Sequence, residues 1–515
     1  MANKASRTKN ARLNTLSSLL LQFVTAISGL IIPRIIIPTY GSQVNGLIAS
    51  ITQFLSYIAL LEAGVGSVFL ASLYKPLYAN DMKTISGIIN EQKRFYHKIG
   101  IVFAFYVILL LIIYPRIAIT TVDRKYLIAL IIILSIGTFV EYFVSLPYQC
   151  LIIADQMVRL INISAIIVIV LNLLLTTLLV SVGADIIFVK LSSCLIAILK
   201  PVVYVWYVKK HYRLDPAEKP NEEALRQRWN GLVHHISFYI HTNTDIVLLT
   251  IFVGTSTVSV YSIYLAVVTG VQKIITSLSS SIGASIGNLI ADGNKKAIDK
   301  TMDQFELMQI IFTTVLFTIT GMMLMPFIHL YTQNMGDAEY SQPIFGYILI
   351  AAEAIYCVRC IYTTVCMSGN KFKETQPGAI LESAVNLTAS IALLIILNTE
   401  GQKLIAIAIG TLLGMLTRLV FEVLYLRRGL IYRPVSKAIK AIAIYLTASF
   451  VSVVICRQIH IYECNSVIEW IGTAILTSLI VISCILLFSI IFYKKTLYEL
   501  YERFTKKSEQ VENGP

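Results

Sequence analysis

Long apolar blocks dominate this sequence, and each has about the length that crosses a membrane as a helix. Fourteen such stretches can be placed along the 515 residues. A membrane helix needs about 20 apolar residues to cross a hydrocarbon layer of ~30 Å. A transmembrane barrel would instead show segments of ~10 residues with alternating polarity. The pattern therefore predicts an all-α integral membrane protein with about 14 transmembrane helices.

The predicted helices share this apolar character and differ mainly in length. They cover residues 13–38, 44–72, 99–119, 126–154, 158–181, 185–209, 232–254, 257–291, 305–331, 341–367, 377–398, 403–426, 437–456 and 467–493. Two polar stretches, 80–98 and 292–304, are expected to form short amphipathic helices on the membrane surface.

Composition supports the membrane assignment. Only 14% of the residues are charged and 56% are hydrophobic, whereas about a quarter of a soluble protein is charged. The net charge of +13 would suggest nucleic-acid binding in a soluble protein, but here membrane topology explains it better. The basic start, MANKASRTKNARLN, leads into a long span with no cleavage site, so we expect a retained first helix instead of a signal peptide.

The distribution of lysine and arginine predicts the orientation. With the amino terminus inside, 31 of the 42 basic residues fall in inner segments, six in outer segments and five within spans. Cytoplasmic loops of membrane proteins carry such an excess of positive charge. Both termini are therefore expected to be cytoplasmic, in a multi-pass protein of the plasma membrane.

The connections indicate two halves. The longest, KKHYRLDPAEKPNEEALRQRWNG, joins the sixth and seventh helices and carries both signs of charge. At a constant offset of 213 residues, Gly41 matches Gly254 and Lys83 matches Lys296. Six helices per half give both copies one orientation, which predicts a parallel repeat around a central cavity. The expected parts are an N-terminal bundle (1–209), a cytoplasmic linker (210–231), a C-terminal bundle (232–428), and two further helices with a cytoplasmic tail (429–515).

Ionisable residues inside the spans are the candidate functional residues, because each costs several kcal/mol in hydrocarbon unless it faces a partner or a cavity. They are Glu62, Glu141, Lys190, Lys200, Asp245, Lys273, Glu353, Arg359, Glu382, Arg418 and Glu422.

Two neighbouring spans carry the strongest polar signals. Lys273 lies on a stripe of hydroxyl residues with three- and four-residue spacing, which favours a surface lining water. His241 and Asp245 are four residues apart and share a face of the preceding helix. We expect Asp245 and Lys273 at similar depth on the two arms of a hairpin. They form either a structural ion pair or a gating and coupling pair, and the sequence leaves both open.

The other charges give less specific signals. Arg418 and Glu422, four residues apart, are expected to form a local salt bridge that Glu382 could join. Glu141 and Glu353 each lie on a polar face of a span. Arg34, between two prolines, either snorkels to the interface or faces the outer mouth of the cavity.

No enzyme or metal motif stands out. The sequence has no phosphate-cradling glycine loop, HExxH motif or nucleophile elbow. Cys357 and Cys360 form a CxxC, but inside an apolar helix and without a second ligand pair, which favours two small buried residues. We expect no metal and no cofactor other than a coupling ion.

Two stretches resemble bacterial polysaccharide transporters. PRIIIPTYGSQVNGLIASITQFLSYIALLEAGVGSVFLASLY (33–74) is similar to their opening, where an arginine and a tyrosine-glycine turn precede a helix ending in EAGVGS. NTDIVLLTIFVGTSTVSVYSIY (243–264) is similar to the matching part of their second half. Together with fourteen helices, this looks like the O-antigen and capsule flippase (Wzx-type) family of the multidrug/oligosaccharidyl-lipid/polysaccharide exporter superfamily.

The resemblance implies two six-helix bundles around a cavity with a lateral portal. It implies a short oligosaccharide on undecaprenyl diphosphate as cargo, turned to the outer leaflet by alternating access for surface polysaccharide synthesis. Its partners would include a polysaccharide polymerase and chain-length machinery. By helix position, cavity cations would be Lys273, Arg34, Arg359 and Lys190. Coupling to H⁺ or Na⁺, or gating, is expected at Asp245, His241, Glu141, Glu353 and Glu62.

Other classes remain to be weighed against this one. A cation-coupled drug exporter of the same superfamily usually has twelve helices. A membrane polymerase or ligase usually carries a long outer loop, whereas the outer loops predicted here have at most about a dozen residues. A scaffold without transport would not explain so many charges within the membrane.

Overall fold

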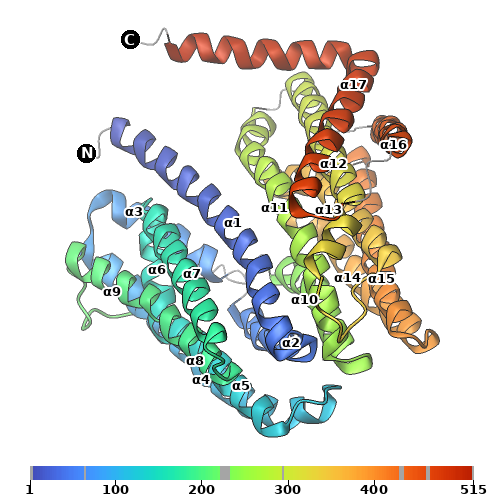
Figure 1. Cartoon of the computed structure of the whole chain (residues 1–515). Helices are drawn as coiled ribbons and strands as arrows, with labels where there is room; N and C mark the ends of the chain where they lie inside the picture. The colour runs from blue at the N-terminus through green and yellow to red at the C-terminus, as the bar shows by residue number, and fades with distance from the viewer. Residues whose placement is uncertain are drawn as a thin grey trace. The chain divides into compact units, whose positions relative to one another are not determined.

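Every element of the computed structural model is a helix in the described residues, which are 4–62, 65–220, 232–292, 295–428, 434–459 and 464–512 (Figure 1). Thirteen helices in these ranges are long and apolar enough to cross a membrane. The predicted span at 232–254 forms α10 (Leu232–Phe252), of which Asn243–Phe252 counts as a shorter apolar helix. The all-helical membrane fold is thus confirmed, while the internal repeat stays a prediction.

The chain forms two compact units. Unit 1 comprises Met1–Ala266 and Asn334–Ala338, and unit 2 comprises Val267–Gln333 and Glu339–Pro515. Besides α10 and the start of α11 (Thr255–Ala291), the helices of unit 1 are α1 (Lys4–Tyr40), α2 (Ser42–Ser56), α3 (Val65–Ala79), α4 (Met82–Ile117), α5 (Arg124–Val140), α6 (Leu146–Ala154), α7 (Val158–Ser181), α8 (Ile186–Ala197) and α9 (Leu199–His211).

Unit 2 continues α11 and adds six helices. They are α12 (Lys295–Tyr331), α13 (Pro343–Ser368), α14 (Phe372–Ile396), α15 (Glu400–Arg428), α16 (Val435–Gln458) and α17 (Val467–Glu512), the last with a kink at Tyr493. Large apolar side chains cover the outside of both units, for example Phe105 at 69% and Phe450 at 70% exposure. A soluble protein rarely exposes so much apolar surface, whereas lipid accommodates it.

The two predicted surface helices are not separate elements, which corrects the sequence analysis. Residues 82–98 belong to α4, which continues without a break to Ile117, and residues 295–304 begin α12. No proline interrupts either junction, and a single glycine such as Gly100 does not stop a helix. Asp81 caps α4: Thr84 donates its backbone N–H and its hydroxyl, which holds the pKa of this carboxylate below its ordinary value.

Several predicted spans are also interrupted. The span at 44–72 changes to a 3₁₀ turn, η1 (Tyr57–Glu62), after α2. The span at 126–154 contains a π-helical turn, η2 (Glu141–Ser145), directly before Pro147, and the span at 185–209 breaks at Ile198, three residues before Pro201. Proline lacks an N–H and collides with the carbonyl four residues earlier, which accounts for the irregular turns before Pro147 and Pro201. The turn Tyr57–Glu62 contains no proline.

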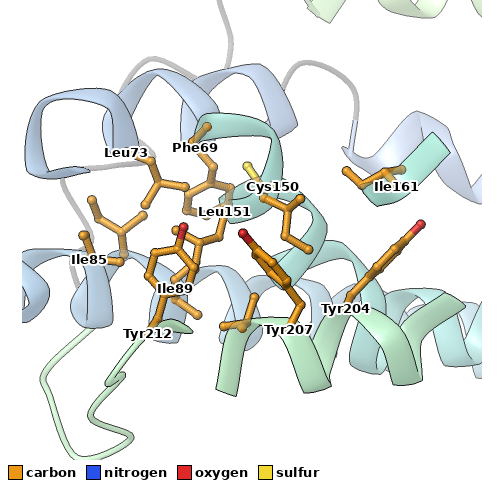
Figure 2. Close-up of a cluster of buried hydrophobic side chains, with 14 of the residues drawn as sticks. Phe69, Leu73, Ile85, Ile89, Cys150, Leu151, Ile161, Tyr204, Tyr207 and Tyr212 are labelled. Carbon is orange, nitrogen blue, oxygen red and sulfur yellow. The ribbon is translucent and has the colours of Figure 1, made fainter. Parts of the chain in front are cut away.

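Buried aromatic and aliphatic side chains hold each unit together. Figure 2 shows the cluster of unit 1 in which Phe69 and Leu73 of α3 meet Ile85 and Ile89 of α4, with tyrosines of α9 on the other side. Tyr212, just beyond α9, donates to Asp155 at 2.5 Å. Burial and this carboxylate raise the pKa of the phenol.

Small residues set the closest helix packing in unit 2. A Cβ at Gly410 of α15 would lie 2.0 Å from the Ser390 Oγ and 2.9 Å from the Asn386 carbonyl oxygen of α14. Helices in a membrane associate mainly through van der Waals packing at close backbone approach, because the hydrophobic effect does not drive them together in lipid. Gly410 therefore permits the contact between α14 and α15.

Gly410→Ala is expected to lower the apparent melting temperature in detergent by several degrees, because forcing a methyl group into a packed interface costs about 1–3 kcal/mol. Gly270→Ala is the matched control: a Cβ there has no neighbour within 4 Å, and alanine gains up to ~1 kcal/mol of helix propensity. Equal melting temperatures for Gly410→Ala and wild type would contradict the packing argument.

Candidate functional site

A cavity of about 380 Å³ lies within unit 1. Its walls come from α1, α2, α7, α8 and the first part of α11. Most lining residues are apolar, and the polar ones are Thr25, Ser28, Asn45, Lys190 and Ser262. A small apolar cavity with a few convergent polar groups is the usual form of a ligand site.

Lys190 is the charged residue of this cavity. It lies on α8, and among the described residues no carboxylate is within ion-pair distance of its ammonium group. A cation in a membrane span normally meets an anion, a carbonyl or water. The cavity therefore offers a cation to an anionic ligand. Arg34, also predicted for this role, is half-buried on α1 beside the lining residue Pro33 but does not line the cavity.

A polar seam joins α2 to α10 and to the start of α11. Asn45 donates from Nδ2 to the Ser259 Oγ at 2.8 Å, and the hydroxyls of Ser50 and Thr250 are 2.6 Å apart. Tyr114 of α4 donates to the same Ser50 at 2.7 Å. These buried bonds, together with the bond from Gln53 to Asn243, define what we call the polar seam.

Backbone contacts continue the polar seam where α10 turns into α11. The Gly46 backbone approaches so closely that a Cβ would lie 1.6 Å from the Thr255 carbonyl oxygen. Ile119, in the loop after α4, bonds through its N–H to Thr250 and through its carbonyl to the Thr255 N–H. Gly41, between α1 and α2, has φ of 87°, and Gly254, between α10 and α11, has φ of 142°. Both values lie in a region that favours glycine. This end of unit 1 is therefore held by many small contacts.

Asp245 has a partner that the sequence analysis missed. It is buried, and Tyr261 donates its hydroxyl to Oδ2 at 2.8 Å across the turn between α10 and α11. Lys273 is exposed on the part of α11 that belongs to unit 2, whereas Asp245 and Tyr261 belong to unit 1. The expected pairing of Asp245 with Lys273 therefore stays a prediction.

Glu62 and Glu141, two predicted coupling residues, are linked in unit 1 through the neighbour of Glu141. Tyr142 donates its hydroxyl to the Glu62 Oε1 at 3.1 Å. Glu62 ends the 3₁₀ turn and Glu141 begins the π-helical turn. Such irregular turns inside helices often occur at functional sites.

Unit 2 contains a buried cluster of four charged residues, Arg359, Glu382, Arg418 and Glu422, which we call the arginine cluster. Arg359 donates to Glu382 at 3.0 Å, and the Arg418 Nη1 lies 3.7 Å from the same carboxylate. The predicted bond from Arg418 to Glu422 is confirmed at 2.6 Å, as is the link to Glu382. All four side chains are at most 7% exposed, which favours a structural role for Arg359 over contact with cargo.

The remaining predicted residues are placed as follows. Glu353 is buried on α13, and the side chain of His241 lies outside what the structure describes. No group of three or more His, Cys, Asp or Glu side chains within the described part of the chain is arranged to hold a metal ion. The sequence analysis missed the polar seam, although Ser42, Asn45, Gln53 and Ser56 recur at helical spacing along α2.

Comparison with known proteins identifies the fold through structure alone. No protein-family model and no curated protein matches the sequence. The structure is similar to that of the lipid II flippase MurJ in an inward closed conformation, with a TM-score of 0.69, 16% identity, and coverage of 94% of this chain and 99% of MurJ.

Multidrug exporters share the same fold. An inward-facing multidrug resistance MATE family transporter of the MOP superfamily aligns with a TM-score of 0.61 and 12% identity over 79% of this chain and 97% of its own. The eukaryotic MATE transporter AtDTX14 aligns with a TM-score of 0.54 and 13% identity over 85% of this chain and 99% of its own. The chain therefore has the fold of MATE and MurJ transporters.

Glu382→Gln is expected to destabilise unit 2, because removing one partner of a buried ion pair typically costs about 3–5 kcal/mol. The apparent melting temperature in detergent should fall markedly. The control is Lys371→Ala, which breaks the exposed pair of Lys371 with Glu374 and should leave the melting temperature unchanged. If Glu382→Gln has the same melting temperature as the wild type, the arginine cluster does not stabilise unit 2.

Proposed function

We propose that this protein is a flippase for an oligosaccharide linked to undecaprenyl diphosphate, which it moves from the inner to the outer leaflet by alternating access. The observation that carries the proposal is Lys190, a cation without a carboxylate partner among the described residues, in a cavity within the membrane-spanning part of unit 1. A diphosphate is the kind of anion that such a cation attracts. The product would serve the synthesis of O-antigen, capsule or exopolysaccharide.

Two further points support a lipid-linked cargo, and a third supports the location. MurJ, which covers 94% of this chain in the structural alignment, is itself described as a lipid II flippase. Lys273 is exposed on a polar stripe of α11 and is a second candidate contact for the cargo. The excess of lysine and arginine in the predicted inner segments supports a plasma-membrane protein with cytoplasmic termini. A polysaccharide polymerase and chain-length proteins would be the expected partners.

Coupling to H⁺ or Na⁺ is part of the proposal. Glu62 and Glu141 are acidic groups linked through Tyr142 within the spans of unit 1. Asp245 and Glu353 are buried carboxylates elsewhere, and His241 shares the helix face of Asp245. Carboxylates inside membrane spans commonly form proton or ion relays in transporters.

A cation-coupled multidrug exporter is the second candidate function. The structural likeness to MATE transporters favours it, as does the acidic pair of Glu62 and Glu141, which suits cationic compounds. The two functions differ in the sign of the charge on the cargo, which is an anionic diphosphate for the flippase and a cation for the exporter. Lys190 would therefore attract the cargo in the first case and repel it in the second.

Lys190→Gln is expected to lower the flipping rate of a fluorescent undecaprenyl-diphosphate sugar in proteoliposomes by about tenfold, since a charge-assisted bond contributes ~1.5–3 kcal/mol. Lys190→Arg should keep most of the rate. Lys209→Gln, at the exposed end of α9, is the matched control and should have no effect. A wild-type flipping rate of Lys190→Gln would contradict the role of Lys190, and no flipping by the wild-type protein would contradict the flippase proposal. Efflux of a cationic dye that is unchanged or faster in Lys190→Gln would favour the exporter.

We propose that the polar seam opens in each cycle of alternating access, because it consists of weak bonds between neutral groups. In a background without the native cysteines, Ser50→Cys with Thr250→Cys should cross-link on oxidation and stop flipping, and reductant should restore it. The control pair, Ser17→Cys with Asn162→Cys, replaces a bond between α1 and α7 and should cross-link without loss of rate. Full activity of the cross-linked Ser50–Thr250 pair would show that the polar seam does not open.

A further inference from the structure

A groove of about 880 Å³ lies in unit 2, apart from the cavity around Lys190. It is formed by α12, α13, α16 and the described residues directly after the break that follows α16. Its volume is within the range of ~300–1,000 Å³ that ligand sites usually have. No role proposed above uses this groove.

The groove is elongated along the helices. On α12 the groove is lined by Phe317, Gly321, Met325 and His329, which follow one another at intervals of four residues. The distance along the helix from the first to the last of them is about 18 Å. Gly321 leaves the groove open: the nearest atom to a Cβ at this position would be the Cδ1 of Ile350, at 4.0 Å. The shape therefore fits a long, narrow molecule parallel to α12.

Polarity changes along this axis. Further from the helix ends, the lining residues are the apolar Phe317, Met322 and Val453, together with Thr318 and Ser449, whose hydroxyls bond to each other at 2.5 Å. His329 near the end of α12, Arg457 near the end of α16 and Asn465 beyond it form the polar end. An amphiphile with an apolar chain and a polar head has this same pattern.

The polar end carries positive charge. The side chains of Arg457 and His329 have no salt bridge or hydrogen bond to any residue in the described ranges. The carboxylate of Glu469 accepts from the backbone N–H of Asn465 at 2.8 Å. A phosphate would give the Arg457 guanidinium a charge-assisted partner.

The groove also borders a surface that contacts lipid. Phe450 and Val454 each follow a lining residue of α16, and they are 70% and 41% exposed. A lipid chain can thus enter sideways from the bilayer. A soluble anion would leave the apolar length of the groove uncovered.

We propose that this groove binds an anionic phospholipid, with an acyl chain along α12 and the phosphate at Arg457 and His329. In the predicted orientation the lipid comes from the outer leaflet. The lipid is a resident component and not the cargo, so the inference does not depend on the proposed function.

The test is native mass spectrometry of the full-length protein in detergent, titrated with phosphatidylglycerol, phosphatidylcholine or glycerol 3-phosphate. Wild type should bind one phosphatidylglycerol at least fivefold more tightly than phosphatidylcholine, and should not retain glycerol 3-phosphate. Arg457→Gln should remove the preference between the two lipids. The matched control Arg427→Gln, at an exposed position of α15, should keep it.

Gly321→Leu separates lipid loss from misfolding. Leucine would fill the groove and should displace the lipid, while its higher helix propensity preserves the folded protein. Its melting temperature without added lipid should equal or exceed that of wild type. The proposal is overturned if folded Gly321→Leu binds phosphatidylglycerol like wild type, if Arg457→Gln keeps the preference, or if wild type binds glycerol 3-phosphate alone equally well.

Discussion

A polar side chain within hydrocarbon must find its partner inside the protein, because no water is there to replace it. The chain meets this constraint in two ways. In unit 1, neutral hydroxyl and amide groups pair across α2, α10 and α11. In unit 2, full charges pair in the arginine cluster on α13, α14 and α15.

The two solutions differ in strength. Hydrogen bonds between membrane helices contribute about 0.6 kcal/mol on average, so the polar seam is a sum of weak contacts that can separate and form again. Breaking a buried ion pair costs about 3–5 kcal/mol, so the arginine cluster suits a part that keeps its shape. In unit 1, Gly46 lets the backbone of α2 approach Thr255 closely, and in unit 2, Gly410 lets the backbone of α15 approach α14 closely.

Lys190 is an exception to this internal pairing. Its cavity supplies hydroxyl and amide groups but, among the described residues, no carboxylate. Arg359, in contrast, has its charge matched by Glu382. Of these two predicted cargo contacts, the lysine is therefore the one whose charge is available to a ligand.

The sequence alone determined the membrane fold, because span length and charge depletion follow directly from the hydrocarbon thickness. It also determined local pairs such as Arg418 with Glu422, since helical geometry puts residues i and i+4 side by side. Only the tertiary structure decided which distant residues meet. Tyr261 as the partner of Asp245, Tyr142 as the partner of Glu62, and Lys190 in a cavity all depend on how separate helices pack. One helical face can pack against any of several neighbours, and its sequence does not state which neighbour it meets.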